Sequence, residues 1–146
     1  MNTFNFSVPQ DITVGKGSLA KLPEIAKKLG GSHAFIISGT HLAKMGLVEK
    51  AADYLKTVDI KTDAFTEIEA NPSVATVEKA TEKFKESGAD FIVAFGGGSP
   101  MDVAKAVGVV AKYGGSITEY EGAHKVPGPI IPLIAIPTTA GTGSEV

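Results

Sequence analysis

Short apolar runs and longer segments with helical spacing alternate along this chain. Three of the runs, at residues 34–37, 91–95 and 133–136, contain no polar position. An unbroken apolar run of this length is typical of a parallel strand that is buried on both faces. Residues 61–65 predict a further strand.

The segments between these runs place apolar residues three and four positions apart, which predicts amphipathic helices. Ser18 and Ser73 stand where helix N-caps are expected, and Gly30 and Gly88 stand where helices end. The predicted helices cover residues 18–29, 47–58, 74–87 and 100–112. Strands alternating with helices predict a Rossmann-like α/β fold, with one parallel sheet and helices on both faces. Residues 4–8 and 12–14 predict a short N-terminal β-hairpin before it.

Three adjacent glycines, Gly96, Gly97 and Gly98, follow the apolar run 91–95 and precede a helix. Such a loop lets the backbone approach a ligand closely, and the free N–H groups of the following helix favour an anion, most often a phosphate. The loop is neither a P-loop nor the G-x-G-x-x-G fingerprint, because Met101 stands where the third glycine would be. A purely structural turn is the alternative interpretation.

Ser99 and Asp102 have the spacing of a capping box, so each of them has a structural interpretation beside the ligand-binding one.

Two other polar loops also follow predicted strands. Ligands bind beyond the carboxyl ends of the strands in such sheets, so the three loops are expected to converge on one site. The residues of the other two loops are Ser38, Gly39 and Thr40 after the first buried strand, and Thr138, Thr139, Thr142 and Ser144 after the last.

Composition narrows the class of protein. The 146 residues are 43% hydrophobic and 21% charged, which fits one domain with an ordinary core. The formal net charge is -2 and no basic cluster occurs, so a nucleic-acid partner is not expected. The chain has no cysteine, which excludes disulfides and thiolate metal ligands and leaves the redox compartment undetermined. It has no signal-peptide pattern and no apolar run of membrane-spanning length, which predicts a cytoplasmic protein without a membrane anchor. His33, His41 and His124 are expected to be solvated or locally hydrogen-bonded.

Three motifs together resemble the iron-containing (group III) alcohol dehydrogenases. In chain order they are EANPS, GGGSPMDVAKAV and IAIPTTAGTGSEV. The resemblance covers essentially the whole chain. Glycerol dehydrogenases and dehydroquinate synthases, in the wider superfamily, share the glycine loop but less of the last motif.

The resemblance implies a nicotinamide cofactor and assigns residues to it. Gly97, Gly98 and Ser99, beside Gly96, would hold the pyrophosphate, and Asp102 would lie near the nicotinamide. Asn71 would contact the cofactor, and the structural explanation of this residue is an Asn-Pro turn. The adenine and phosphate region would be lined by Thr138, Thr139 and Thr142.

The loop after the first strand departs from the pattern of many relatives, which carry an aspartate there. Gly39 occupies that position, flanked by Ser38 and Thr40. Without a carboxylate to repel a 2′-phosphate, and with two hydroxyls beside it, this loop predicts NADP as the cofactor, with NAD also accepted.

The resemblance also concerns what lies outside this sequence. The family holds iron or zinc with an aspartate and three histidines in a helical C-terminal domain, and no residue here matches those ligands. We therefore expect an isolated dinucleotide-binding domain over residues 1–146, without metal ligands or an assigned catalytic residue. Family members commonly dimerise through N-terminal strands, where Phe4, Phe6 and Val8 stand here.

Three functions are consistent with these observations. The first is an NAD(P)-dependent alcohol dehydrogenase, which transfers hydride between an alcohol or aldehyde and nicotinamide. The second is an NADP(H)-binding module without appreciable catalysis. The third is a flavodoxin-like domain that binds another phosphorylated ligand at the glycine loop.

Overall fold

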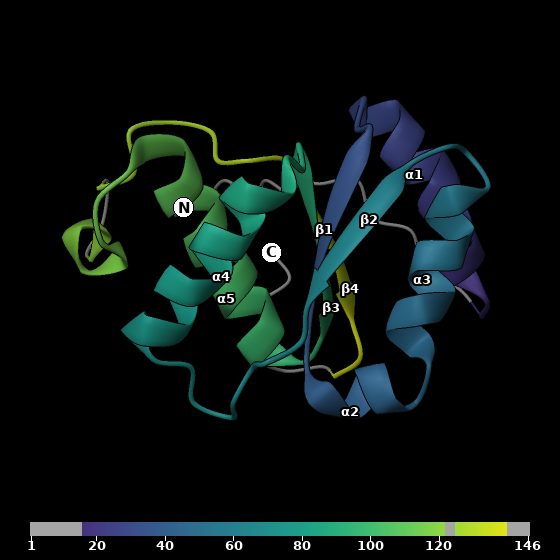
Figure 1. Cartoon of the computed structure of the whole chain (residues 1–146), viewed down its shortest axis with the longest axis horizontal. Coiled ribbons are helices and arrows are strands. Elements are labelled where there is room, and N and C mark those ends of the chain that lie inside the picture. The colour runs from purple at the N-terminus through teal and green to yellow at the C-terminus, as the bar shows by residue number, and fades with distance from the viewer. Residues whose placement is uncertain (1–15, 122–124, 140–146) are drawn as a thin grey trace, which may run out of the picture.

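Four parallel strands form one sheet in the computed structural model, which describes residues 16–121 and 125–139. Their order across the sheet is β2-β1-β3-β4. The strands are β1 (His33–Ser38), β2 (Lys61–Phe65), β3 (Phe91–Gly96) and β4 (Leu133–Pro137). The chain moves from β1 outward to β2 and then crosses back to β3 on the other side of β1 (Figure 1). The strand order therefore reverses between β1 and β3, where a sheet of this kind has its ligand crevice.

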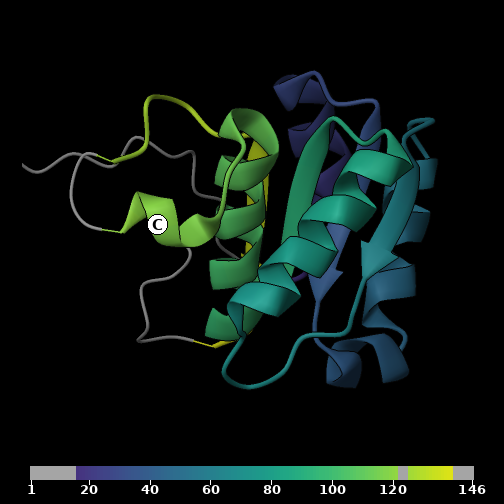
Figure 2. The same ribbon diagram turned by 60° about the vertical axis from the view of Figure 1, so that its left-hand side comes forward.

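Helices cover both faces of the sheet (Figures 1 and 2). On one face lie α1 (Leu22–Leu29) and α3 (Leu47–Lys56), and on the other lie α4 (Val74–Ser87) and α5 (Gly98–Tyr113). The short α2 (Thr40–Lys44) follows β1 and lies beside the carboxyl ends of the strands, at the bottom of Figure 1. Two 3-10 turns complete the described elements, η1 (Ser18–Lys21) and η2 (Ile117–Tyr120).

Alternate residues of the central strands enter two separate cores, which explains why their sequences show no polar alternation. Ala34 and Ile36 of β1 pack with α1 and α3, whereas Phe35 and Ile37 pack with α4 and α5. All four are fully buried. The Phe35 ring meets that of Phe84 edge to face, with centroids 5.6 Å apart. Both faces are thus closed by helices, and ligand access is left to the strand ends.

The predicted Rossmann-like α/β class is confirmed, and two predicted elements have the bounds observed, β2 and α4. The Ser73 cap is also confirmed, since its Oγ accepts a hydrogen bond from the Thr76 backbone N–H at 3.2 Å. The Ser18 cap is wrong, because Ser18 lies inside η1 and no side chain caps either η1 or α1. The predicted N-terminal hairpin lies outside the described residues.

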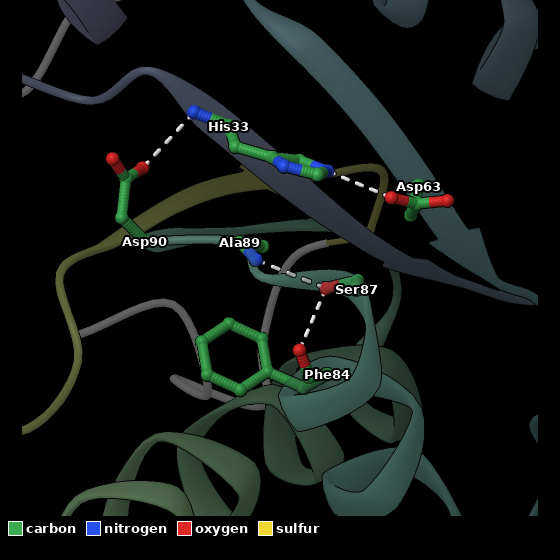
Figure 3. Close-up of polar contacts among 6 residues, drawn as sticks. All are labelled: His33, Asp63, Phe84, Ser87, Ala89 and Asp90. Atoms are coloured by element: carbon green, nitrogen blue, oxygen red, sulfur yellow. Dashed lines mark hydrogen bonds and ion pairs between the residues drawn. The ribbon is translucent and has the colours of Figure 1, made fainter.

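A polar cluster ties the strands together at their amino ends (Figure 3). The carboxylate of Asp90 accepts hydrogen bonds from the Ser32 backbone N–H and hydroxyl and from the His33 backbone N–H. The His33 ring lies 2.7 Å from the Asp63 carboxylate on the neighbouring strand (Figure 3). Burial raises the pKa of Asp90, but the hydrogen bonds from Ser32 and His33 outweigh it and hold the pKa below its ordinary value.

Candidate functional site

A cleft of about 300 Å³ opens at the carboxyl ends of β1 and β3, where the strand order reverses. Four segments meet in it: the start of α2, the connection between β2 and α4, the glycine loop that leads into α5, and Thr138 directly after β4. The loops after β1, β3 and β4 therefore converge, as the sequence predicts. The lining residues are Gly39, His41, Leu42, Ile68, Glu69, Ala70, Gly96, Gly97, Gly98, Ser99, Pro100 and Thr138.

The glycine loop has a conformation that larger residues would not reproduce. Gly96 ends β3 with φ at 142°, a region that L side chains rarely adopt, and an added Cβ would lie 3.0 Å from Pro100 Cγ. A Cβ on Gly97 would lie 3.3 Å from the Thr139 hydroxyl oxygen. The Thr138 backbone N–H donates to the Gly96 carbonyl at 2.9 Å, which holds the last described loop against this one. The glycines thus keep the floor of the cleft free of side chains.

Helix α5 begins at Gly98, and its N-cap, Gly97, is extended and provides no side chain. The predicted capping box of Ser99 and Asp102 is therefore wrong. Ser99 lies inside the first turn, and its hydroxyl instead donates to the Ala70 carbonyl at 2.8 Å. The backbone N–H groups of Gly98 and Ser99 have no partner within the helix, and they lie at the positive end of a 16-residue helix dipole. Such a helix start favours an anionic group of a ligand.

The loop after β1 differs from the sequence-based expectation at its two hydroxyls. Ser38 is fully buried, and its hydroxyl donates to the Phe95 carbonyl at 2.6 Å. The Thr40 hydroxyl donates to the Thr66 carbonyl at 3.1 Å. Both protons are thus used within the protein, so the predicted donation of these hydroxyls to a phosphate is not supported. Gly39 between them lines the cleft, and no atom lies within 4 Å of an added Cβ.

The remaining predicted residues are distributed around the cleft. Asn71 is exposed on the connection between β2 and α4, directly after the lining residue Ala70. Asp102 is exposed in the first turns of α5, and Thr139 is exposed beside the glycine loop. Thr142 lies outside the described residues.

Glu69 is one of several lining residues that the sequence did not indicate, because it belongs to an acidic stretch of the kind that is usually solvated. Its carboxylate accepts hydrogen bonds from the Ser73 backbone N–H, at 3.0 Å, and from the Thr76 hydroxyl. These two bonds, that from Thr76 being the stronger cause, lower the pKa of Glu69. Its position four residues before a Ser N-cap was the available signal.

A larger depression, of about 650 Å³, lies at the opposite end of the sheet. It is bounded by the end of α3 and the amino ends of β1 and β2, and His33, Lys56 and Lys61 are among its lining residues. Its lining residues include no glycine loop and no helix start, and their charges are of both signs. The smaller cleft, which has both a glycine loop and a helix start, is therefore the better candidate for an anionic ligand.

Comparison with known proteins matches residues 9–146 to the family described as iron-containing alcohol dehydrogenase. The chain belongs to this family. Among curated relatives, the NAD-dependent methanol dehydrogenase of Bacillus methanolicus is 36% identical over 97% of this chain and 37% of its own length. The sulfoacetaldehyde reductase of Bilophila wadsworthia is 39% identical over 92% of this chain and 35% of its own length.

Solved structures of iron-containing alcohol dehydrogenases share the fold. A crystal structure of 1,3-propanediol oxidoreductase superposes with a TM-score of 0.92 and 33% identity, covering 99% of this chain and 38% of that one. The sulfoacetaldehyde reductase of Bifidobacterium kashiwanohense, solved in complex with NAD+, gives a TM-score of 0.89 with 33% identity and the same coverage. The chain thus spans little more than a third of the length of the relatives it matches.

Two further properties concern the described residues alone. No helix in residues 16–121 and 125–139 is long and apolar enough to cross a membrane. Within the same residues, no three His, Cys, Asp or Glu side chains are grouped to hold a metal ion.

Proposed function

We propose that this chain is the dinucleotide-binding part of an NAD(P)-dependent alcohol dehydrogenase, which transfers hydride between an alcohol or aldehyde and nicotinamide. The observation that carries the proposal is the glycine loop at the start of α5, placed in the cleft where the strand order reverses. Membership of the iron-containing alcohol dehydrogenase family supports the same chemistry.

The residues present fit a dinucleotide. The backbone N–H groups of Gly98 and Ser99 would hold the pyrophosphate, because the floor at Gly96 and Gly97 has no side chain to obstruct it. Asn71 would contact the cofactor from the connection between β2 and α4. Asp102 would lie toward the nicotinamide, and Thr138, Thr139 and Thr142 would line the adenine and phosphate region. When bound, the nicotinamide accepts hydride from an alcohol or returns it to an aldehyde.

The part of this chain in the reaction is to bind and orient. A site that holds the cofactor in one orientation lowers the entropy cost of bringing cofactor and substrate together. The described residues do not fit the family's metal, since they offer no cluster of ligands, and we assign no step to a metal here. The domain assignment, a dinucleotide-binding unit over residues 1–146, belongs to the same proposal.

For the cofactor itself, we propose that NADP(H) binds at least as well as NAD(H). The support is Gly39, which leaves the end of β1 without a carboxylate that would repel a 2′-phosphate. The names of two relatives point to NAD, one as an NAD-dependent enzyme and one as a complex with NAD+. Both cofactors therefore belong in the test.

The test is an equilibrium titration of NADH and NADPH fluorescence with this chain. We expect both to bind, with NADPH at least equal to NADH. A tenfold preference for NADH would refute the NADP part, and failure of both to bind would refute the whole proposal.

A second assay separates catalysis from binding. Formation of NADPH or NADH is followed with a series of short alcohols, with and without a metal chelator. Turnover supports a dehydrogenase, whereas intact cofactor binding without turnover supports the alternative of an NADP(H)-binding module.

We also propose that the protein forms a homo-oligomer through its N-terminal segment, at Phe4, Phe6 and Val8, and that it is cytoplasmic. These three residues lie outside the described part of the chain. Light scattering that shows a strict monomer at high concentration would refute the homo-oligomer. The cytoplasmic location is tested by cell fractionation.

A further inference from the structure

The connection between β2 and α4 forms one wall of the cleft, and a closed ring of hydrogen bonds organises it. The Glu69 carboxylate accepts from the Ser73 backbone N–H and from the Thr76 hydroxyl. The Ser73 and Thr76 hydroxyl oxygens lie 3.1 Å apart, and the Thr76 backbone N–H donates to Ser73 Oγ at 3.2 Å. Because the Thr76 hydroxyl donates its proton to Glu69, the Ser73 hydroxyl is the donor in its contact with Thr76. Each proton in the ring then has one acceptor.

The ring joins an exposed loop to a rigid helix. Thr76 is only 8% exposed in the first turn of α4, while Glu69 is exposed. Between Glu69 and Ser73 the loop contains three residues, Ala70, Asn71 and Pro72. The backbone of these residues is therefore fixed relative to α4 by one side chain.

The same loop is tied to both neighbouring loops of the cleft. The Ala70 carbonyl accepts from the Ser99 hydroxyl at 2.8 Å, next to the start of α5. At its other end, the Thr66 carbonyl accepts from the Thr40 hydroxyl at 3.1 Å. A shift of the loop would therefore break a contact with the glycine loop.

We propose that Glu69 is a positioning residue for cofactor binding: it holds Ala70 and Asn71 as a preformed wall beside the glycine loop. This inference rests on the proposed function, because the ligand it serves is the dinucleotide. Glu69 acts through the wall, since its carboxylate is used by Ser73 and Thr76 and a second anion would repel it.

Charge and positioning predict opposite signs for its removal, which makes the inference testable. A dinucleotide is an anion, so removing a carboxylate from the cleft tightens binding if charge alone matters. If the carboxylate positions the wall, its removal leaves the wall in the competent arrangement for only part of the time. The apparent Kd rises by the inverse of that fraction, so one-tenth occupancy corresponds to about tenfold weaker binding.

The experiment compares three single variants of this chain by titration of NADH and NADPH fluorescence. Glu69→Ala is expected to weaken both cofactors about tenfold. Glu69→Gln keeps an oxygen acceptor for Ser73 and Thr76, and is expected to bind as well as the parent or better. Glu67→Ala is the matched control, because Glu67 carries the same charge on the same loop but pairs with Lys79 at 2.7 Å and does not line the cleft. It is expected to leave Kd unchanged or slightly lower.

A double-mutant cycle tests the route through Ala70. Ser99→Ala removes the hydroxyl that holds the Ala70 carbonyl but keeps the backbone N–H groups of the cradle. We expect it to weaken binding in the parent and to have little further effect in the Glu69→Ala background. Circular dichroism on each variant verifies that the fold is retained.

The outcomes separate the two claims. If the parent binds neither cofactor, the proposed function fails. If the parent binds and Glu69→Ala binds equally or more tightly, the positioning role is refuted while the proposed function stands. Equal loss in Glu69→Ala and Glu69→Gln, or additive effects with Ser99→Ala, would also overturn it.

Discussion

Introducing a carboxylate at Gly39 is expected to reverse the choice between NADPH and NADH. The position accepts a side chain without strain, since its φ is -86° and no atom lies within 4 Å of an added Cβ. Gly39→Asp therefore changes charge at the end of β1 without displacing the backbone. The matched control is Gly39→Asn, which has nearly the same shape and no charge.

The magnitude follows from Coulomb's law. Two unit charges about 4 Å apart interact by about 1 kcal/mol in bulk water, and the 2′-phosphate carries roughly two charges. The carboxylate is thus expected to cost NADPH about 2 kcal/mol, or roughly 30-fold in Kd. NADH lacks this phosphate, and its free ribose hydroxyls donate to the carboxylate instead, for about 1 kcal/mol. The ratio of the two Kd values should therefore shift by roughly 100-fold or more.

Fluorescence titration of the parent and both variants, at low and high salt, measures this ratio. The shift between Gly39→Asp and Gly39→Asn should shrink with added salt, because the cleft is open and its charges are screened. An unchanged ratio in Gly39→Asp would refute the placement of the 2′-phosphate at the end of β1. An equal shift in Gly39→Asn would refute the electrostatic reasoning.

Three further changes test the fold that holds the site, each by urea unfolding. Gly96→Ala should destabilise the chain by about 1–3 kcal/mol, because alanine disfavours φ near 142°. The control Gly39→Ala should be nearly neutral, and equal destabilisation by the two variants would contradict the backbone argument. Ser73→Ala should cost about 1 kcal/mol by loss of the α4 cap, and an unchanged midpoint would show that the cap is dispensable. Asp90→Asn should destabilise at neutral pH. The folded-state pKa of Asp90 lies below its ordinary value of 3.8. The stability that its carboxylate contributes is therefore present above about pH 4 and is lost as the pH falls through the folded pKa. A difference in unfolding free energy between parent and variant that stays constant down to about pH 2 would contradict this reasoning.

Much of the architecture could be predicted because it depends on local pattern. The bounds of α4 follow from apolar spacing and from the turn residues at its ends, and Ser73 has the cap geometry that its sequence position indicates. The burial of β1 and β3 on both faces follows from their unbroken apolar runs. The bounds of the five-residue α2 could not be predicted, because one turn is too short to show apolar periodicity.

The polar details of the cleft depended on contacts between residues far apart in the chain. Ser99 matches a capping box, but its hydroxyl reaches Ala70, 29 positions earlier. Ser38 looked like a ligand to a phosphate, yet its hydroxyl is buried against the Phe95 carbonyl on the neighbouring strand. In both cases a hydroxyl that stands next to the cleft donates to a backbone carbonyl of another segment of the chain. Sequence identifies such residues as polar and well placed, and only the fold shows which acceptor they reach.

A crystal structure of this chain with NADPH would show where the cofactor binds. We expect the pyrophosphate at the start of α5, within hydrogen-bond reach of the Gly98 and Ser99 backbone N–H groups, and the 2′-phosphate beside Gly39. Cofactor bound elsewhere, for example in the larger depression lined by His33, Lys56 and Lys61, would contradict this expectation.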